Sequence, residues 1–186
     1  MEVKTVLHGA EDGMKRAVEH ARIELTKIRT GRASVSMLDS IQVDYYGTMT
    51  PLTQVANVST PDATMIIVQP WEKTMLGPIE KAILAANLGL TPGNDGQVIR
   101  LPIPPLTEER RKEIAKHAKQ IAEESKVGVR NARREAMEQL KKAEKEEHLS
   151  EDLRRDAEID VQELTDKYVG EIDTVYQAKE KEIMTV

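Results

Sequence analysis

Proline is confined to the middle of this chain of 186 residues. All eight prolines lie between Pro51 and Pro105, whereas residues 1–29 and 107–186 contain none. A proline inside a helix removes a backbone hydrogen bond and clashes with the preceding turn. Long uninterrupted helices are therefore expected in the two flanks, and the middle must be built from shorter elements.

Apolar residues in the flanks recur at alternating spacings of three and four, the period of one helical face. Such series cover residues 7–28, 114–136 and 153–175. The second follows a threonine and two acids at Thr107, and the third follows Ser150 and two acids, which are typical helix starts. We therefore predict three long helices, the second about 40 residues or about 60 Å long, packed as an elongated bundle.

The middle of the chain has the pattern of strands and turns. Residues 40–47, 64–70 and 97–103 have the composition of strands, and residues 75–89 predict a helix that ends at Gly89. The sequence thus predicts an α+β protein. Its bundle domain comprises residues 1–30 and 106–186, and a small inserted β/α/β domain comprises residues 31–105.

An inserted domain is joined to its host by two chain crossings. We expect these crossings to form a hinge whose freedom is limited by proline. The predicted hinge residues are Thr30, Gly31, Pro102, Pro104 and Pro105.

Charge is strongly separated along the second flank. Residues 110–134 contain nine Lys or Arg and three Glu, whereas residues 135–186 contain eight Lys or Arg and sixteen Asp or Glu. At 100° per residue, seven cations of the second predicted helix fall within an arc of about 100°, opposite the apolar face. This predicted basic stripe consists of Lys112, Lys116, Lys119, Lys126, Arg130, Arg133 and Arg134.

The basic stripe has two interpretations. It is either the solvated outer face of a helix or a surface for RNA phosphates. Glu123 is the only acid in the arc, although Glu–Lys pairs are the usual way to stabilise an exposed helix. Arginine forks also fit phosphate oxygens, and duplex RNA is recognised largely through its backbone. The acidic third predicted helix has three interpretations. It is a solvated face, a surface that repels RNA, or a surface that contacts a basic protein.

Signatures of catalysis and cofactor binding are absent from the sequence. There is no cysteine, the four histidines have no metal-ligand spacing, and no glycine-rich phosphate loop or nucleophile elbow occurs. We therefore expect no enzyme activity, catalytic residue, metal or cofactor. Because neither a secretion signal nor a membrane-length apolar run is found, we expect a cytoplasmic monomer without membrane contact.

Several motifs resemble those of the bacterial ribosome recycling factor family, in the same order and over essentially the whole chain. They are KIRTGRAS (27–34), VDYYGT (43–48), TPLTQVANV (50–58), IEKAILAANLGLTP (79–92), IRLPIPPLTEERRKE (99–113) and VRNARREA (129–136). The resemblance implies an L-shaped molecule with an antiparallel three-helix bundle. It also implies binding to large-subunit ribosomal RNA of the post-termination ribosome. With elongation factor G and GTP, such a protein splits the subunits and releases mRNA and tRNA.

The resemblance also assigns roles to particular residues. Arg130, Arg133 and Arg134 match the family's RNA contacts, while Arg29 and Arg32 are possible RNA contacts or hinge-flanking residues. Two alternatives are a coiled-coil adaptor that binds a protein without RNA, and an enzyme with a pocket around the middle-domain aromatics. These aromatics, Tyr45, Tyr46 and Trp71, are expected instead to pack in the core and at the hinge.

Overall fold

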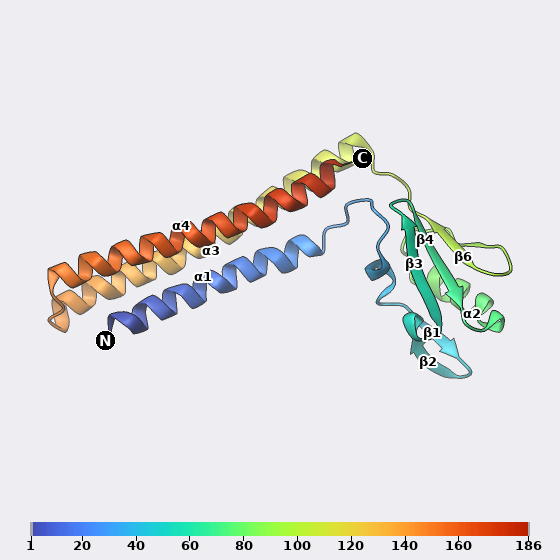
Figure 1. The fold of residues 1–186 in the computed structure, drawn as a ribbon, viewed down its shortest axis with the longest axis horizontal. Coiled ribbons are helices and arrows are strands. Elements are labelled where there is room, and N and C mark those ends of the chain that lie inside the picture. Colours follow the sequence, from blue (N-terminus) through green and yellow to red (C-terminus); the bar gives the residue numbers. More distant parts are fainter. Residues whose placement is uncertain (1, 186) are drawn as a thin grey trace. The chain divides into compact units, whose positions relative to one another are not determined.

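The computed structural model describes residues 2–185, which form two compact units (Figure 1). One unit combines the chain up to Thr30 with the chain from Glu108 onward, and the other is Gly31–Thr107. The chain therefore crosses between the units at residues 30–31 and again at 107–108, the second crossing two residues later than expected.

Three long helices form the first unit: α1 (Val3–Thr26), α3 (Glu108–Glu146) and α4 (Glu151–Met184). They lie side by side, and each contacts both others (Figure 1). α3 has 39 residues, as the spacing predicted, and the absence of proline lets it run without a break. The predicted three-helix bundle is confirmed.

Small residues bring α1 and α3 close together. A Cβ atom added at Gly128 would lie 3.3 Å from Cβ of Ala17, and one added at Gly13 would lie 3.2 Å from Cβ of Ala132. The two contacts run in opposite chain directions, so α1 and α3 are antiparallel. A side chain at either glycine would therefore require the facing alanine to move by a few tenths of an ångström.

The remaining seams of the bundle are filled by aliphatic side chains and one tyrosine. On α1 the buried residues begin at Val6, one position before the predicted series. The fully enclosed core residues include Met14, Leu25, Leu140, Val161, Ile172 and Ile183.

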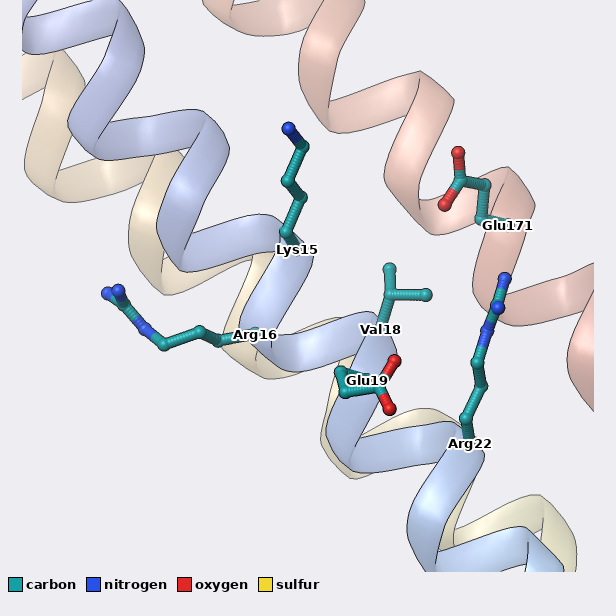
Figure 2. Close-up of a pocket in the computed structure, with 6 residues that line it drawn as sticks. All are labelled: Lys15, Arg16, Val18, Glu19, Arg22 and Glu171. Carbon is teal, nitrogen blue, oxygen red and sulfur yellow. The ribbon is translucent and has the colours of Figure 1, made fainter.

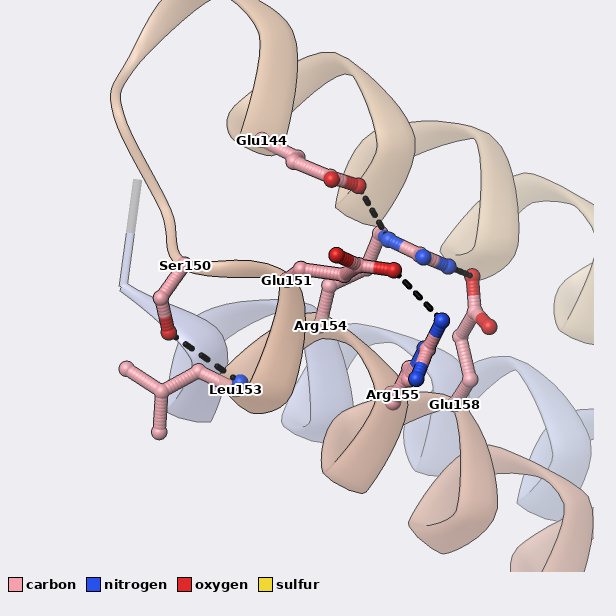
Figure 3. Close-up of polar contacts among 7 residues, drawn as sticks. All are labelled: Glu144, Ser150, Glu151, Leu153, Arg154, Arg155 and Glu158. Atoms are coloured by element: carbon pink, nitrogen blue, oxygen red, sulfur yellow. Dashed lines mark hydrogen bonds and ion pairs between the residues drawn. The ribbon is translucent and has the colours of Figure 1, made fainter.

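The turn between α3 and α4 is fixed by polar contacts (Figure 3). The Ser150 side chain accepts a 3.2 Å hydrogen bond from the backbone N–H of Leu153, so Ser150 is the predicted N-cap. Arg154 forms ion pairs with Glu144 of α3 and Glu158 of α4. One guanidinium group therefore holds the two helices together where they reverse direction.

The second unit contains two antiparallel sheets and one helix. β1 (Gln42–Tyr45) pairs with β2 (Thr48–Pro51). The other sheet has the order β3-β4-β6-β5. Its strands are β3 (Ala56–Asp62), β4 (Met65–Pro70), β5 (Gly93–Asn94) and β6 (Ile99–Pro102). The helix is α2 (Leu76–Ala85), and three 3-10 turns lie at Val35–Leu38, Leu52–Gln54 and Lys73–Met75.

Alternation along the central strands builds the core of this unit. Ile66 of β4 lies opposite Leu101 of β6, and Val68 lies opposite Ile99; all four are completely buried. Side chains with a two-residue period fall on one face of a sheet, so this face is apolar. The buried face of α2 adds Ile79 and Ile83 to the same cluster.

The prediction for the middle of the chain was incomplete in three places. β2, β3 and β5 were not predicted, because their polar residues and prolines weaken the strand pattern. α2 ends at Ala85 rather than at Gly89, since Asn87 adopts a left-handed φ of 53° after the last turn. Pro102 is the last residue of β6, opposite Met65, and therefore belongs to the sheet rather than to a free connection.

Candidate nucleic-acid interface

The seven cations of the predicted basic stripe all lie on α3, but they differ in exposure. Lys126 and Arg133 are half-buried, and the other five are exposed. The exposed members are Lys112, Lys116, Lys119, Arg130 and Arg134. The stripe is thus an exposed row of positive charge flanked by two side chains that turn toward the rest of the bundle.

Most exposed members of the stripe have no acidic partner. Lys112 forms a 3.5 Å ion pair with Glu108 one turn earlier. Within residues 2–185, no ion pair or hydrogen bond engages the side-chain nitrogens of Lys116, Lys119, Arg130 or Arg134. Their charges are therefore available to an external anion without the loss of an internal contact.

Lys126 departs from the predicted pattern. Its Nζ atom forms ion pairs with Asp173 of α4 and with Glu123, the latter at 3.4 Å, and its side chain is only 13% exposed. The hydrogen bond to Asp173 is the main cause that raises the pKa of Lys126. The helical wheel could not show the pairing with Asp173, because that acid comes from another helix, and the assignment of Lys126 to the RNA-binding stripe stays a prediction.

Arg133 is shared between the surface and the helix interface. Its Nε atom donates a 2.8 Å hydrogen bond to Oε1 of Gln162 on α4. This bond fixes the guanidinium group while leaving its two terminal nitrogens without a hydrogen bond to the described chain. A fixed fork loses less conformational entropy when it binds a phosphate.

The acidity of α4 is concentrated in its first half. Residues 151–166 contain seven Asp or Glu and two Arg, whereas residues 167–184 contain four Asp or Glu and three Lys. The Lys126–Asp173 contact places the second half of α4 beside the middle of the stripe, whereas the Arg133–Gln162 contact places the first half beside its last members. Most of the acidic half therefore lies beside the part of α3 that follows the stripe, and within residues 2–185 none of its acids forms an ion pair with Arg130 or Arg134.

A hollow of about 420 Å³ lies between α1 and α4 (Figure 2). Its lining residues are Lys15, Arg16, Val18, Glu19, Arg22 and Glu171. The carboxylates of Glu19 and Glu171 lie on either side of Val18, and Arg16 points away from α4 (Figure 2). Because cations and carboxylates are mixed here, the hollow is a weaker anion site than the stripe. No local sequence pattern marks this hollow, because its lining residues come from two helices that are distant in sequence.

Comparison with known proteins agrees with the geometry. The family model described as "Ribosome recycling factor" matches residues 21–184. A ribosome-recycling factor of Nitratidesulfovibrio vulgaris is 54% identical over the full length of both chains, and one of Burkholderia mallei is 55% identical over the same extent. The chain belongs to the ribosome recycling factor family.

Solved structures give the same family. A solution structure of the ribosome recycling factor covers the whole chain with a TM-score of 0.75 and 44% identity, and 99% of that structure is matched. A second match covers all of both chains with a TM-score of 0.64 and 42% identity. This match is a model of the T. thermophilus ribosome recycling factor and the E. coli elongation factor G bound to the E. coli post-termination complex. Members of this family are translation factors and not enzymes.

The predicted hinge residues occupy distinct environments. Thr30 Oγ1 donates a 3.2 Å hydrogen bond to Glu182 of α4. Gly31 has a left-handed φ of 78°, which favours glycine. Pro104 and Pro105 lie outside helices and strands, unlike Pro102. The exposed side chains of the two possible contacts, Arg29 and Arg32, form no ion pair within the described chain.

Two aromatic residues were assigned to the wrong environment by the sequence analysis. Tyr46 is 73% exposed and Trp71 is 66% exposed, whereas core and hinge packing was expected for both. Only Tyr45 is half-buried and packs against the core of the small unit. The signal that was overlooked is the Tyr-Gly turn, because a hairpin turn holds its residues at the surface.

Among residues 2–185, no cluster of three acidic or histidine side chains suits a metal ion. In that same part of the chain, no helix combines the length and hydropathy that a membrane span requires.

Proposed function

We propose that this protein binds the post-termination ribosome through the basic stripe on α3. Together with elongation factor G and GTP, it then separates the subunits, so that mRNA and tRNA are released. The name of the family, ribosome recycling factor, supports this function. Elongation factor G accompanies a similar protein in one of the matched structures. The proposed site of action is the cytoplasm, in keeping with the bacterial origin of the similar ribosome-recycling factors.

The observation that carries the docking surface is the row of unpaired cations on one rigid helix. Lys116, Lys119, Arg130 and Arg134 are exposed, and nothing in the described chain neutralises them. Like charges on neighbouring turns repel one another unless an anion lies between them. The phosphates of ribosomal RNA supply such anions, and guanidinium forks bind them with two hydrogen bonds.

The mechanical part of the proposal concerns the two chain crossings. A continuous helix of 39 residues transmits a load along its axis without an internal break. The small unit is joined to the bundle by only two covalent connections, at residues 30–31 and 107–108. Reorientation at these connections would let the small unit move while the stripe remains bound.

Ribosome binding at several salt concentrations tests the docking surface. Arg134→Gln removes one unpaired cation of the stripe. Arg155→Gln is the matched control, because it removes the same charge from an exposed arginine that pairs with Glu151 on α4. We expect Arg134→Gln to reduce the slope of log affinity against log salt by about one, and Arg155→Gln to leave it unchanged.

Equal effects of the two substitutions would contradict docking by the stripe. Competition with isolated large-subunit RNA separates this function from that of a protein adaptor, because an adaptor would be indifferent to the added RNA. Subunit separation, followed by light scattering with elongation factor G and GTP, then tests the recycling step itself.

A further inference from the structure

One ridge of α3 carries its unpaired cations at its two ends and none in its middle. Residues three or four positions apart are neighbours on a helix surface, so a series with these spacings forms a continuous ridge. This α3 ridge consists of six exposed residues: Lys116, Lys119, Glu123, Val127, Arg130 and Arg134. Its four cations form two pairs, and Lys119 is separated from Arg130 by about 16 Å along the helix axis.

The middle of the α3 ridge offers negative rather than positive charge. Oε1 of Glu123 lies 3.4 Å from Nζ of Lys126, and the same Nζ atom pairs with Asp173 of α4. Two carboxylates therefore surround one ammonium group. The side chain of Lys126 is 13% exposed, whereas those of Glu123 and Asp173 are 54% and 43% exposed. A phosphate placed here would meet the carboxylates first and would be repelled.

Val127 is the other member of the middle. Its side chain is 50% exposed, and on the ridge it lies between Glu123 and Arg130. A valine side chain has no group that binds a phosphate. The two central members of the α3 ridge are thus a carboxylate and an apolar side chain, and neither of them suits an RNA backbone.

This arrangement fits the groove of a duplex better than a single strand that follows the helix. The phosphates of such a strand would lie over Glu123 and Val127, where the α3 ridge has no cation. When a duplex lies across the ridge, each pair of cations meets one backbone and the middle faces the groove. In an RNA duplex the minor groove is wide and shallow and displays 2′-hydroxyl groups, whereas side chains cannot read the major groove. A hydroxyl group donates a hydrogen bond to a carboxylate.

We propose that the α3 ridge binds one duplex of large-subunit ribosomal RNA across its minor groove. The two lysines contact the phosphates of one strand, and the two arginines contact those of the other strand. Glu123 accepts a hydrogen bond from a 2′-hydroxyl group, and Val127 packs against the sugars. This inference rests on the proposed function, because it specifies the form of RNA to which the basic stripe binds.

Glu123→Ala gives results of opposite sign for the two arrangements. If phosphates lay over the middle of the α3 ridge, loss of this carboxylate would strengthen ribosome binding. Across a minor groove the same substitution removes the acceptor of a hydrogen bond. We therefore expect ribosome affinity to fall about fivefold at every salt concentration. The slope of log affinity against log salt should remain unchanged, since no phosphate contact is lost.

Glu124→Ala is the matched control for this substitution. Glu124 is an exposed acid at the next position, and a rotation of about 100° places it off the α3 ridge. We expect it to cause no loss of ribosome affinity. Circular dichroism should show both variants folded, because alanine is the best helix former. Unchanged or higher affinity of Glu123→Ala, or an equal loss with Glu124→Ala, would overturn the proposal.

Directed cleavage of RNA identifies the groove. The chain has no cysteine, so Gln120→Cys introduces a single attachment point for an iron chelate that generates hydroxyl radicals. Gln120 is exposed and lies beside the α3 ridge without belonging to it, so the proposed contacts are preserved. Because sugars line the minor groove, we expect cuts in both strands of one duplex when the protein is bound to post-termination ribosomes.

Ile159→Cys provides the control for the cleavage experiment, since Ile159 is a 58% exposed residue of α4. A chelate at this position should not produce the paired cuts. Cuts from Gln120→Cys in one strand only or in two separate RNA elements would overturn the proposal. The absence of cuts on ribosomes that bind this variant would overturn it as well.

These experiments separate the inference from the function on which it rests. If Arg134→Gln lowers the salt slope but Glu123→Ala does not weaken binding, the basic stripe still docks on RNA. Only its placement across a minor groove then fails. If the unchanged protein neither binds ribosomes nor separates subunits, the proposed function fails first.

Discussion

The Nε atom of Arg133 donates a 2.8 Å hydrogen bond to Oε1 of Gln162, and this bond joins α3 to α4. Arg133 is therefore both a member of the basic stripe and a structural contact within the bundle. Its replacement changes two properties at once, whereas Arg130 and Arg134 have no such bond to the described residues.

Arg133→Ala should lower both bundle stability and ribosome affinity. A hydrogen bond to a half-buried guanidinium contributes about 1 kcal/mol, so we expect the melting temperature to fall by about 3 °C. Gln162→Ala removes the same bond from α4 and should produce a similar fall with unchanged ribosome affinity. Circular dichroism and ribosome binding check the pair. If Gln162→Ala weakens ribosome binding as much as Arg133→Ala does, Arg133 acts through the helix contact alone.

Lys126→Met should behave differently from a substitution in the unpaired part of the stripe. Lys126 pairs with Asp173 and Glu123, so loss of its charge should cost up to about 1 kcal/mol of stability. The slope of log ribosome affinity against log salt should remain unchanged, whereas Lys119→Met should make it shallower by about one. Salt titrations of both variants provide the measurement. An equal change in slope would show that Lys126 leaves Asp173 to bind RNA.

The difference between Lys126 and its neighbours shows where sequence reasoning stops. A helical wheel places residues on α3 correctly, because the angle per residue is fixed. It contains no information on the acids that α4 brings to the same surface. Asp173 lies 47 positions further along the chain, and only the packing register of α3 against α4 places it beside Lys126.

Local sequence patterns were most reliable where local geometry decides the structure. Ser150 was recognised as an N-cap because its hydroxyl and the N–H of Leu153 are only three residues apart. The exposed positions of Tyr46 and Trp71 could not be recognised in this way. Aromatic residues in strand-like segments are usually half-buried, and the hydrogen bonds to Glu72 that orient the hairpin tyrosines join distant parts of the sequence.

Tyr168 should make the stability of the bundle depend on alkaline pH. Burial, followed by the 2.9 Å hydrogen bond to Glu11, raises the pKa of Tyr168 to about 12. The unfolded chain releases this proton near pH 10, while the folded protein keeps it. The contribution is therefore fully present below about pH 10 and is lost as the pH rises toward 12.

Tyr168→Phe tests this titration. It should remove the hydrogen bond to Glu11, lower stability at pH 7 by about 1.5 kcal/mol and flatten the decline above pH 10. Chemical denaturation at several pH values gives the slope, and the difference in phenolate absorbance between the two proteins gives the pKa of Tyr168. A phenolate that appears near pH 10 in the folded protein would contradict the buried hydrogen bond.

Any side chain at Gly31 should destabilise the small unit, whether or not Gly31 acts as a hinge. Its φ of 78° is left-handed, and an added Cβ atom would lie 2.6 Å from Cγ of Leu106. For a residue with a Cβ atom the left-handed backbone costs about 1–2 kcal/mol of stability, and the displacement of Leu106 adds to this cost. Gly89 has a φ of 73° with nothing within 4 Å of an added Cβ atom, so it reports the backbone term alone.

We therefore expect Gly31→Ala to destabilise the small unit by more than Gly89→Ala does. Combination with Leu106→Ala should remove the excess, because the contact partner is then absent while the backbone penalty remains. Thermal unfolding of the variants, with Leu106→Ala alone as reference, measures both terms. Equal losses for Gly31→Ala and Gly89→Ala would show that Leu106 moves aside freely. If a side chain at Gly31 then impairs subunit separation, the cause would be the altered backbone conformation at the first chain crossing and not the contact with Leu106.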